Sequence, residues 1–127
     1  MEYIKNKQVS ELLLAWEETY KKGQLTLWIF LALKDGKKYV DEIKSFVEEQ
    51  SERTMTAEDQ SLYRNLRKYK HVGVVDFESR KGHRGPERKY YYLTSLGRDL
   101  LDQFLARNIN LFFNERIKQL ITKKEVS

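Results

Sequence analysis

Residues 73–94 read GVVDFESRKGHRGPERKYYYLT. Apolar or small residues alternate with mostly polar residues on both sides of a Gly-rich, basic segment, residues 81–86. A period of two residues is typical of β-strands, and a Gly-rich segment between two such runs is typical of a turn. The pattern predicts that residues 73–94 form an antiparallel β-hairpin, the only β-structure in the chain, with its tip near 81–86.

Four segments before the hairpin repeat apolar residues with a period near that of an α-helix. They are residues 9–21, 24–34, 39–51 and 57–71. The second is apolar on nearly every side, so we expect it at the centre of the domain. Thr56 precedes an acidic pair that includes Asp59, which predicts a capping box at the start of the fourth helix.

The helical period returns after the hairpin and continues to about residue 122. One helix of roughly 27 residues would be about 40 Å long. Its apolar stripe is longer than the rest of the domain needs, so we expect a twofold homodimer in which this helix packs on its mate and on residues 9–20 of the partner. The residues expected at the dimer interface are Leu12, Trp16, Leu101, Phe104, Leu105, Phe112 and Ile117.

The order of three helices and then a two-stranded hairpin is that of a winged helix-turn-helix. The predicted fold is therefore mainly α with one β-hairpin, with an added N-terminal helix and a long C-terminal dimerisation helix. Residues 1–94 are expected to form the DNA-binding domain, and residues 95–127 the dimerisation helix.

The composition of the chain limits the classes of function that it could have. The chain has 127 residues, a formal net charge of +5 and no cysteine, which excludes disulfides and zinc sites built on sulfur. From Arg53 to Thr94 ten Lys/Arg stand against five Asp/Glu, while the rest of the chain is balanced. A basic middle segment indicates a surface that faces a polyanion. The longest apolar stretch, residues 25–33, is too short to span a membrane. Nothing at the N-terminus resembles a signal peptide, because Glu2, Lys5 and Lys7 interrupt it, so we expect a cytoplasmic protein.

A helix fits the major groove of DNA, where base edges present distinct donors and acceptors. The outer face of helix 57–71 carries polar and basic side chains: Gln60, Ser61, Arg64, Asn65, Arg67 and Lys68. The hairpin tip carries Arg80, Lys81, His83 and Arg84, which we expect to touch phosphates or to enter the minor groove. The alternative is that both are ordinary solvent-exposed surfaces.

Three motifs resemble the PadR family of transcriptional regulators. They are Leu62-Tyr63-x-x-Leu66, then Gly73-Val74-Val75, then Gly85-Pro86-Glu87-Arg88-Lys89-Tyr90-Tyr91-Tyr92-Leu93-Thr94-x-x-Gly97-x-x-Leu100-Leu101. The resemblance covers about residues 23–105. It implies a winged helix-turn-helix, a C-terminal helix that makes a homodimer, and a DNA-binding regulator, which we expect to be a repressor. It also implies that Tyr63 lies near a DNA phosphate.

The sequence departs from the family pattern at three places. The family often begins its recognition helix with a Ser-Pro-Gly-Thr-like segment, whereas residues 57–61 read AEDQS, and Glu58 and Asp59 would repel phosphates. Tyr69 replaces a usual leucine. Some relatives hold flat drugs with an aromatic residue on the C-terminal helix, where this chain has Asn108, so the resemblance does not imply drug sensing. Trp16, Trp28, Phe104, Phe112 and Phe113 are expected in the core or the dimer interface rather than in a pocket.

Other classes of function fit less well. Residues 82–85 form a GxxG like that of the KH RNA-binding loop, but that loop joins two helices. The acidic residues stand in adjacent pairs, and the chain has only two histidines, His71 and His83. These residues assemble no catalytic or metal cluster. We therefore expect no enzyme, metal or cofactor, with duplex DNA and a second copy of the chain as partners. The remaining alternative, motivated by Glu58 and Asp59, is a winged-helix interaction or dimerisation module that does not bind DNA.

Overall fold

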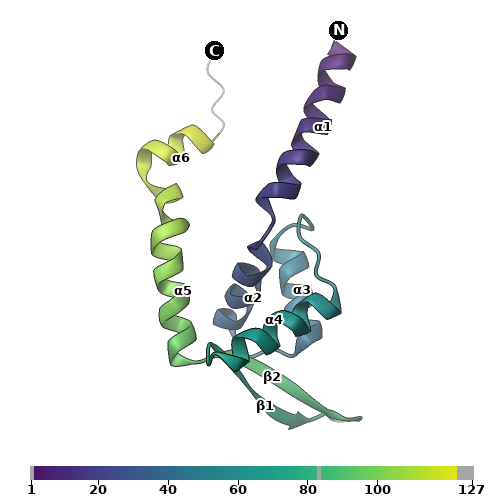
Figure 1. Ribbon diagram of the computed structural model, residues 1–127, viewed down its shortest axis with the longest axis vertical. Coiled ribbons are helices and arrows are strands. Elements are labelled where there is room, and N and C mark those ends of the chain that lie inside the picture. Colours follow the sequence, from purple (N-terminus) through teal and green to yellow (C-terminus); the bar gives the residue numbers. More distant parts are fainter. Residues whose placement is uncertain (1, 83, 123–127) are drawn as a thin grey trace.

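The computed structural model describes residues 2–82 and 84–122. Its first part consists of helices α1 (Glu2–Tyr20), α2 (Gln24–Asp35), α3 (Val40–Gln50) and α4 (Asp59–His71). Strands β1 (Val75–Lys81) and β2 (Glu87–Leu93) follow, and then α5 (Ser95–Asn108), the 3-10 helix η1 (Asn110–Phe113) and α6 (Glu115–Ile121) (Figure 1). The prediction of a mainly helical fold with one β-hairpin is confirmed.

Helix α2 lies at the centre of the body, as its all-round apolar sequence predicts. Ile29, Phe30, Ala32 and Leu33 are all buried. They pack with buried side chains from α3, α4, both strands and α5 in one continuous core. Phe30 meets Tyr69 of α4 edge to face, with ring centres 5.0 Å apart.

A tight turn joins α3 to α4. Glu52 and Arg53 adopt positive φ angles of 53° and 65°, and the buried Ser51 hydroxyl accepts a hydrogen bond of 3.0 Å from the backbone N–H of Met55. The capping box predicted at Thr56 is wrong: α4 begins at Asp59, and its N-cap Glu58 makes no side-chain capping bond. Met55 and Ala57, in the segment that precedes the helix, are buried in the core.

The hairpin has a regular antiparallel register in which Val75 pairs with Leu93 and Lys81 pairs with Glu87. This confirms the predicted hairpin and its tip. An isolated β-bridge adds to it, because Lys38 and Tyr91 exchange backbone hydrogen bonds of 3.1 and 2.8 Å. The segment before α3 is thereby fixed to the outer edge of β2.

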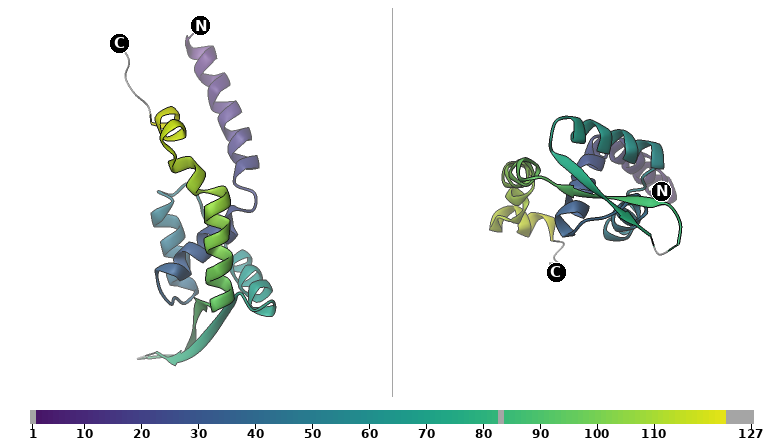
Figure 2. Two further views of the ribbon diagram at one scale, coloured as in Figure 1. Left: turned by 90° about the vertical axis from the view of Figure 1, so that its left-hand side faces the viewer. Right: turned by 90° about the horizontal axis from the view of Figure 1, so that it is seen from below.

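The C-terminal segment corrects the prediction of one long helix. Helix α5 ends at Asn108, and Asn114 is extended, with its side-chain Oδ1 accepting a 2.8 Å hydrogen bond from the N–H of Ile117. Asparagine side chains compete for backbone groups in this way, so they end and restart helices that an apolar pattern alone would continue. The break turns α6 away from the axis of α5 (Figures 1 and 2).

Helix α1 extends away from the body. It begins at Glu2, seven residues earlier than predicted, and none of its residues is buried. The Lys21 ammonium, just after the helix, donates a 2.6 Å hydrogen bond to the carbonyl oxygen of Thr54 in the α3–α4 turn. Both α1 and α6 lie at the end of the molecule opposite the hairpin (Figure 1).

Candidate nucleic-acid interface

Helix α4 presents a polar outer face over the buried residues Leu62 and Leu66. The side chains of Gln60, Tyr63, Arg64, Arg67 and Lys68 are exposed, and Ser61 is half-buried. Residues 60, 63, 64 and 67 follow the i, i+3, i+4, i+7 spacing and therefore lie on one face of the helix. Within the described part of the chain, neither Arg64 nor Arg67 makes an ion pair.

Asn65 differs from the expectation that it faces outward. Its Nδ2 donates a 2.8 Å hydrogen bond to Oγ1 of Thr26 in α2, so the side chain points into the body. The reason is positional: Asn65 precedes Leu66 on the inner side of α4, and Thr26 offers the only polar partner found for it among the described residues. We therefore remove Asn65 from the set of residues that could contact bases.

The basic side chains of the hairpin are of two kinds. Arg80 is exposed but engaged by its neighbours: its Nε donates a 2.9 Å hydrogen bond to Glu78, its Nη2 binds the same carboxylate, and its guanidinium stacks on the ring of Tyr90. Lys81 and Arg84 are exposed and make no ion pair in the ranges 2–82 and 84–122. The fourth predicted residue of this set, His83, lies outside the described residues.

Arg88 is a basic residue that the sequence interpretation missed. Its guanidinium carbon lies 4.5 Å from the centre of the Tyr39 ring. Tyr39 in turn meets Tyr90 with ring centres 5.5 Å apart, and Arg80 lies 4.3 Å from the Tyr90 ring. These four residues form a tyrosine–arginine stack across the hairpin and the start of α3. Its only indication in the sequence is the run of residues 88–92, RKYYY, which is also part of the third motif that resembles a known family.

Three acids near this surface form exposed ion pairs with lysine or arginine side chains of the same chain. Asp59 lies 3.6 Å from the ammonium of Lys44, and Asp76 lies 3.5 Å from that of Lys70. Glu78 binds Arg80 and also lies 3.4 Å from Lys37. The hydrogen bond from Arg80, together with Lys37, holds the pKa of Glu78 below its usual value. Paired acids of this kind repel a polyanion less than their number in the sequence suggests.

A depression of about 360 Å³ lies between α4 and the hairpin, beside the start of α3. We call it the helix–wing depression, and it is lined by Tyr39, Val40, Asp41, Tyr63, Glu87, Arg88, Lys89 and Tyr91. Burial raises the pKa of the Tyr91 hydroxyl, Tyr63 raises it further, and Arg67 opposes both. The Tyr91 hydroxyl is therefore protonated at neutral pH and able to donate a hydrogen bond.

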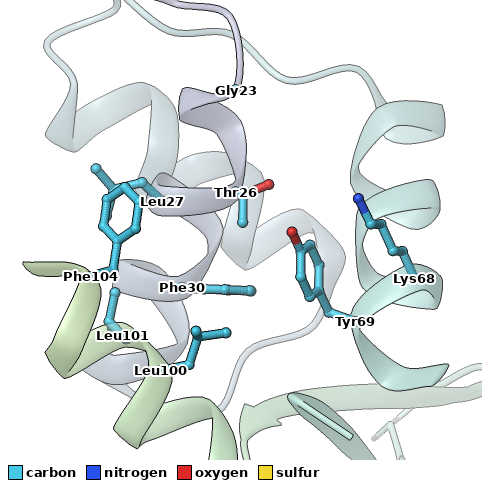
Figure 3. A pocket seen from close by; sticks show the side chains of 9 residues that line it. All are labelled: Gly23, Thr26, Leu27, Phe30, Lys68, Tyr69, Leu100, Leu101 and Phe104. Carbon is cyan, nitrogen blue, oxygen red and sulfur yellow. The ribbon is translucent and has the colours of Figure 1, made fainter. Parts of the chain in front are cut away.

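A second cavity, of about 420 Å³, lies between α2, α4 and α5 (Figure 3). Phe30, Leu27, Leu100 and Phe104 give it apolar walls, while the hydroxyls of Thr26 and Tyr69 lie on one side. Phe104 is the one member of the predicted aromatic set that lines this cavity.

The residues expected at a dimer interface differ in their exposure. Leu12, Trp16, Phe104 and Phe112 are exposed in the protomer, and Leu105 and Ile117 are half-buried. Leu101 corrects the expectation, because it is only 2% exposed and belongs to the core against α2. Its position on α5 faces the body rather than the surface.

Within residues 2–82 and 84–122, no helix is long and apolar enough to cross a membrane. The same residues contain no group of three or more His, Asp or Glu side chains placed to hold a metal ion.

The geometry described above defines a class: a winged helix with an exposed basic helix beside a basic hairpin. The family model of the transcriptional regulator PadR-like family matches residues 29–103. The chain therefore belongs to the PadR-like family of transcriptional regulators. Among curated proteins no sequence matches the chain.

Solved structures share this fold. A PadR-like transcription factor from Bacteroides fragilis is similar, with 26% identity, a TM-score of 0.63, and coverage of 84% of this chain and 98% of that one. A PadR family regulator from Eggerthella lenta, 21% identical, has a TM-score of 0.61 over 95% and 99% of the two chains. Bacillus subtilis PadR in complex with operator DNA is 21% identical, with a TM-score of 0.56 over 81% of this chain and 50% of that one.

Proposed function

We propose that the protein is a cytoplasmic regulator of transcription that binds double-stranded DNA sequence-specifically as a homodimer and acts as a repressor. The observation that carries the proposal is the exposed, unneutralised pair Arg64 and Arg67 on the outer face of α4, with Lys81 and Arg84 on the neighbouring hairpin. In this proposal α4 enters the major groove and the hairpin is the wing. The structure of Bacillus subtilis PadR with operator DNA supports it by analogy of fold.

Binding would divide between two surfaces. Gln60, Ser61, Arg64 and Lys68 would contact base edges, because they lie on the helix that fits the groove. Tyr63, Arg67 and the wing residues would contact the sugar–phosphate backbone, which fixes position without reading sequence. The proposal assigns residues 1–94 to DNA binding and residues 95–127 to dimerisation.

The dimer is proposed from the apolar surface that one protomer leaves exposed. Leu12 and Trp16 on α1 and Phe104, Phe112, Phe113 and Leu120 near the C-terminus all face solvent in the protomer. An apolar surface of that extent is rarely left in water by a monomer. A twofold axis would bring α1 of each protomer onto the C-terminal helices of the other. Both protomers would then use the same surface.

Selection of bound duplexes from a random pool tests the proposal, followed by affinity measurements over a salt series. We expect a palindromic sequence with half-sites about one helical turn apart, or a multiple of that spacing. The logarithm of affinity should fall steeply and linearly with the logarithm of salt concentration, since several cations contact phosphates. A chain that retains no duplex at low salt would instead be an interaction module, the alternative that the exposed Glu58 at the start of α4 favours.

A further inference from the structure

The junction between α1 and α2 determines the direction in which α1 leaves the body. Gly23 directly precedes α2 and has a positive φ of 80°, a backbone conformation that glycine adopts at little cost. The backbone N–H of Gln24 donates a 3.0 Å hydrogen bond to the carbonyl oxygen of Lys21, which closes the turn. Because no residue of α1 is buried, its direction depends on this turn and on contacts that reach from the turn to the body.

Lys21 makes such a contact. Its ammonium donates a 2.6 Å hydrogen bond to the carbonyl oxygen of Thr54 and lies 3.9 Å from the carboxylate of Glu17 in α1. The Lys21 side chain is 33% exposed, so water screens the contact only in part. Within residues 2–82 and 84–122, this is the one side-chain hydrogen bond or ion pair that joins residues 2–23 to any residue beyond Gln24.

The α3–α4 turn holds the Thr54 carbonyl in a fixed place. The Thr54 hydroxyl donates a 2.8 Å hydrogen bond to the carbonyl oxygen of Ser51, which is itself buried. Glu52 and Arg53 adopt left-handed backbone conformations, which residues other than glycine keep only where the surrounding structure fixes them. Since α4 follows directly, Lys21 connects α1 to the segment that leads into this helix.

The other connection between the body and the proposed dimer surface runs through α5, on a different side of α2 (Figure 1). The cavity of about 420 Å³ lies between α5 and helices α2 and α4 (Figure 3). Leu100 and Phe104 of α5 line it and are 43% and 45% exposed. Space at this point allows the angle between α5 and the body to change. The contact from Lys21 therefore adds a second restraint on the helices that carry the proposed dimer surface.

The direction of α1 matters for DNA binding because α1 carries part of that dimer surface. A helix of 19 residues is about 28 Å long. A rotation of about 7° at its base moves its far end by about 3.4 Å, the length of one base-pair step. In a twofold dimer both protomers change together, so a small rotation at the junction alters the separation of the two copies of α4.

We propose that Lys21 is a positioning residue that sets the half-site spacing which the dimer accepts. Its ammonium holds α1 at one angle to the body, and this angle fixes the separation and the relative orientation of the two copies of α4. The inference rests on the proposed DNA binding and dimer. It adds a determinant of operator specificity that lies outside both surfaces assigned to DNA contact.

The first test measures affinity as a function of half-site spacing, with the full chain. Lys21→Met keeps the apolar stem and removes the ammonium. Lys22→Met is the matched control, because Lys22 is exposed and its side chain makes no hydrogen bond or ion pair to a described residue. The duplexes are the selected sequence and versions with the half-sites one or two base pairs closer together or farther apart.

We expect wild type and Lys22→Met to lose roughly tenfold or more in affinity at the first change of one base pair. Lys21→Met should lose less than about threefold, because its two recognition helices can adjust to the new spacing. Lys21→Arg retains a charged donor and should restore the wild-type profile. A purely destabilising substitution would lower affinity without changing this profile.

The second test needs no DNA. The chain has no cysteine, so Ser45→Cys on the exposed side of α3 accepts a single spin label in each protomer. Double electron–electron resonance then measures the distance between the two labels of a dimer. We expect one narrow distribution of distances for the wild-type background and for Lys22→Met, and a broader distribution for Lys21→Met. Thermal melting establishes that all variants fold.

Four outcomes would overturn the inference. A folded Lys21→Met variant with the wild-type spacing profile, or with an equal loss at every spacing, would show that the ammonium does not set the spacing. A distance distribution as narrow as that of wild type would show that α1 keeps its angle without Lys21. A wild-type chain that accepts every spacing equally would leave nothing for Lys21 to determine. These results refute the role of Lys21 alone, whereas a wild-type chain that binds no duplex refutes the proposed function and this role with it.

Discussion

Gly97 lies against the backbone carbonyl oxygen of Val74, so closely that a Cβ at position 97 would overlap that oxygen. Gly97 is in the first turn of α5, and Val74 directly precedes β1. Thr94 completes the junction: its hydroxyl donates a 2.6 Å hydrogen bond to the carbonyl of Gly73 and accepts one of 3.1 Å from the N–H of Gly97. The start of the C-terminal helix is therefore fixed to the base of the hairpin.

Replacing Gly97 with alanine should lower the free energy of unfolding by about 3 kcal/mol, because a methyl group must displace backbone that cannot move independently. Urea denaturation followed by circular dichroism measures the change. Gly36→Ala is the control: a methyl group there would meet no atom within 4 Å, and the extended backbone at this position accepts any residue. Equal stability of the two variants would contradict the close contact between Gly97 and Val74.

The hairpin and the central helix were predictable because their sequences satisfy two requirements at once. Residues 75–81 and 87–93 alternate in polarity, and the Gly-rich segment between them permits only a turn. Residues 24–34 are apolar on nearly every side, which favours a position at the centre of the domain. Local pattern and tertiary environment agree at both places, so the period alone identifies the element.

The remaining features depend on contacts between distant residues. Asn65 turns inward because Thr26, 39 positions earlier, accepts its hydrogen bond. Arg80 pairs with Glu78 and stacks on Tyr90, so less of its positive charge is available to a ligand than the sequence suggests. The apolar stripe after residue 95 continues past Asn114, although the helix is broken there. The break comes from a side-chain cap, which a hydrophobic period does not predict.

Replacing Arg64 and replacing Arg84 with alanine should affect DNA binding in different ways. Loss of a base-edge contact at Arg64 should cost about 1–3 kcal/mol per half-site and relax sequence preference at one position. Loss of a phosphate contact at Arg84 should weaken binding to all duplexes alike and reduce the salt slope by about one unit per protomer. Affinities for the selected and for a random duplex across a salt series separate the two effects.

The reverse pattern, with sequence preference changed by Arg84→Ala and only the salt slope changed by Arg64→Ala, would exchange the roles of helix and wing. Unchanged affinity in both variants would show that neither surface binds DNA. Arg107→Ala serves as the control, because Arg107 is exposed on α5 at a distance from both surfaces.

Glu78→Gln should strengthen duplex binding by about threefold to tenfold and steepen the salt slope by about one unit per protomer, since it releases Arg80 and Lys37. Glu115→Gln, on α6, removes an acid remote from the wing and should change neither quantity. No change in Glu78→Gln would mean that Arg80 and Lys37 do not approach the DNA.

The same residue predicts a pH dependence of stability. Pairing holds the pKa of Glu78 below its usual 4.5, so the folded state favours the carboxylate. The resulting stability is present above pH 4.5 and is lost as the pH falls through the lowered pKa. Thermal melting of wild type and Glu78→Gln should therefore converge in acid; a difference that grows in acid would have the wrong sign.

The dimer proposal makes a prediction that the protomer alone does not. Leu12 and Leu14 are equally exposed, at 66% and 68%, but only Leu12 lies on the apolar stripe of α1 with Val9, Leu13, Trp16 and Tyr20. Leu12→Ser should remove about 2 kcal/mol of burial twice in a twofold dimer, which raises the dissociation constant by roughly a thousandfold. Leu14→Ser should leave the dimer intact. Sedimentation velocity over a concentration series measures both constants. Two variants that dissociate equally would indicate that α1 is covered on all sides, and two intact dimers would place the interface away from α1.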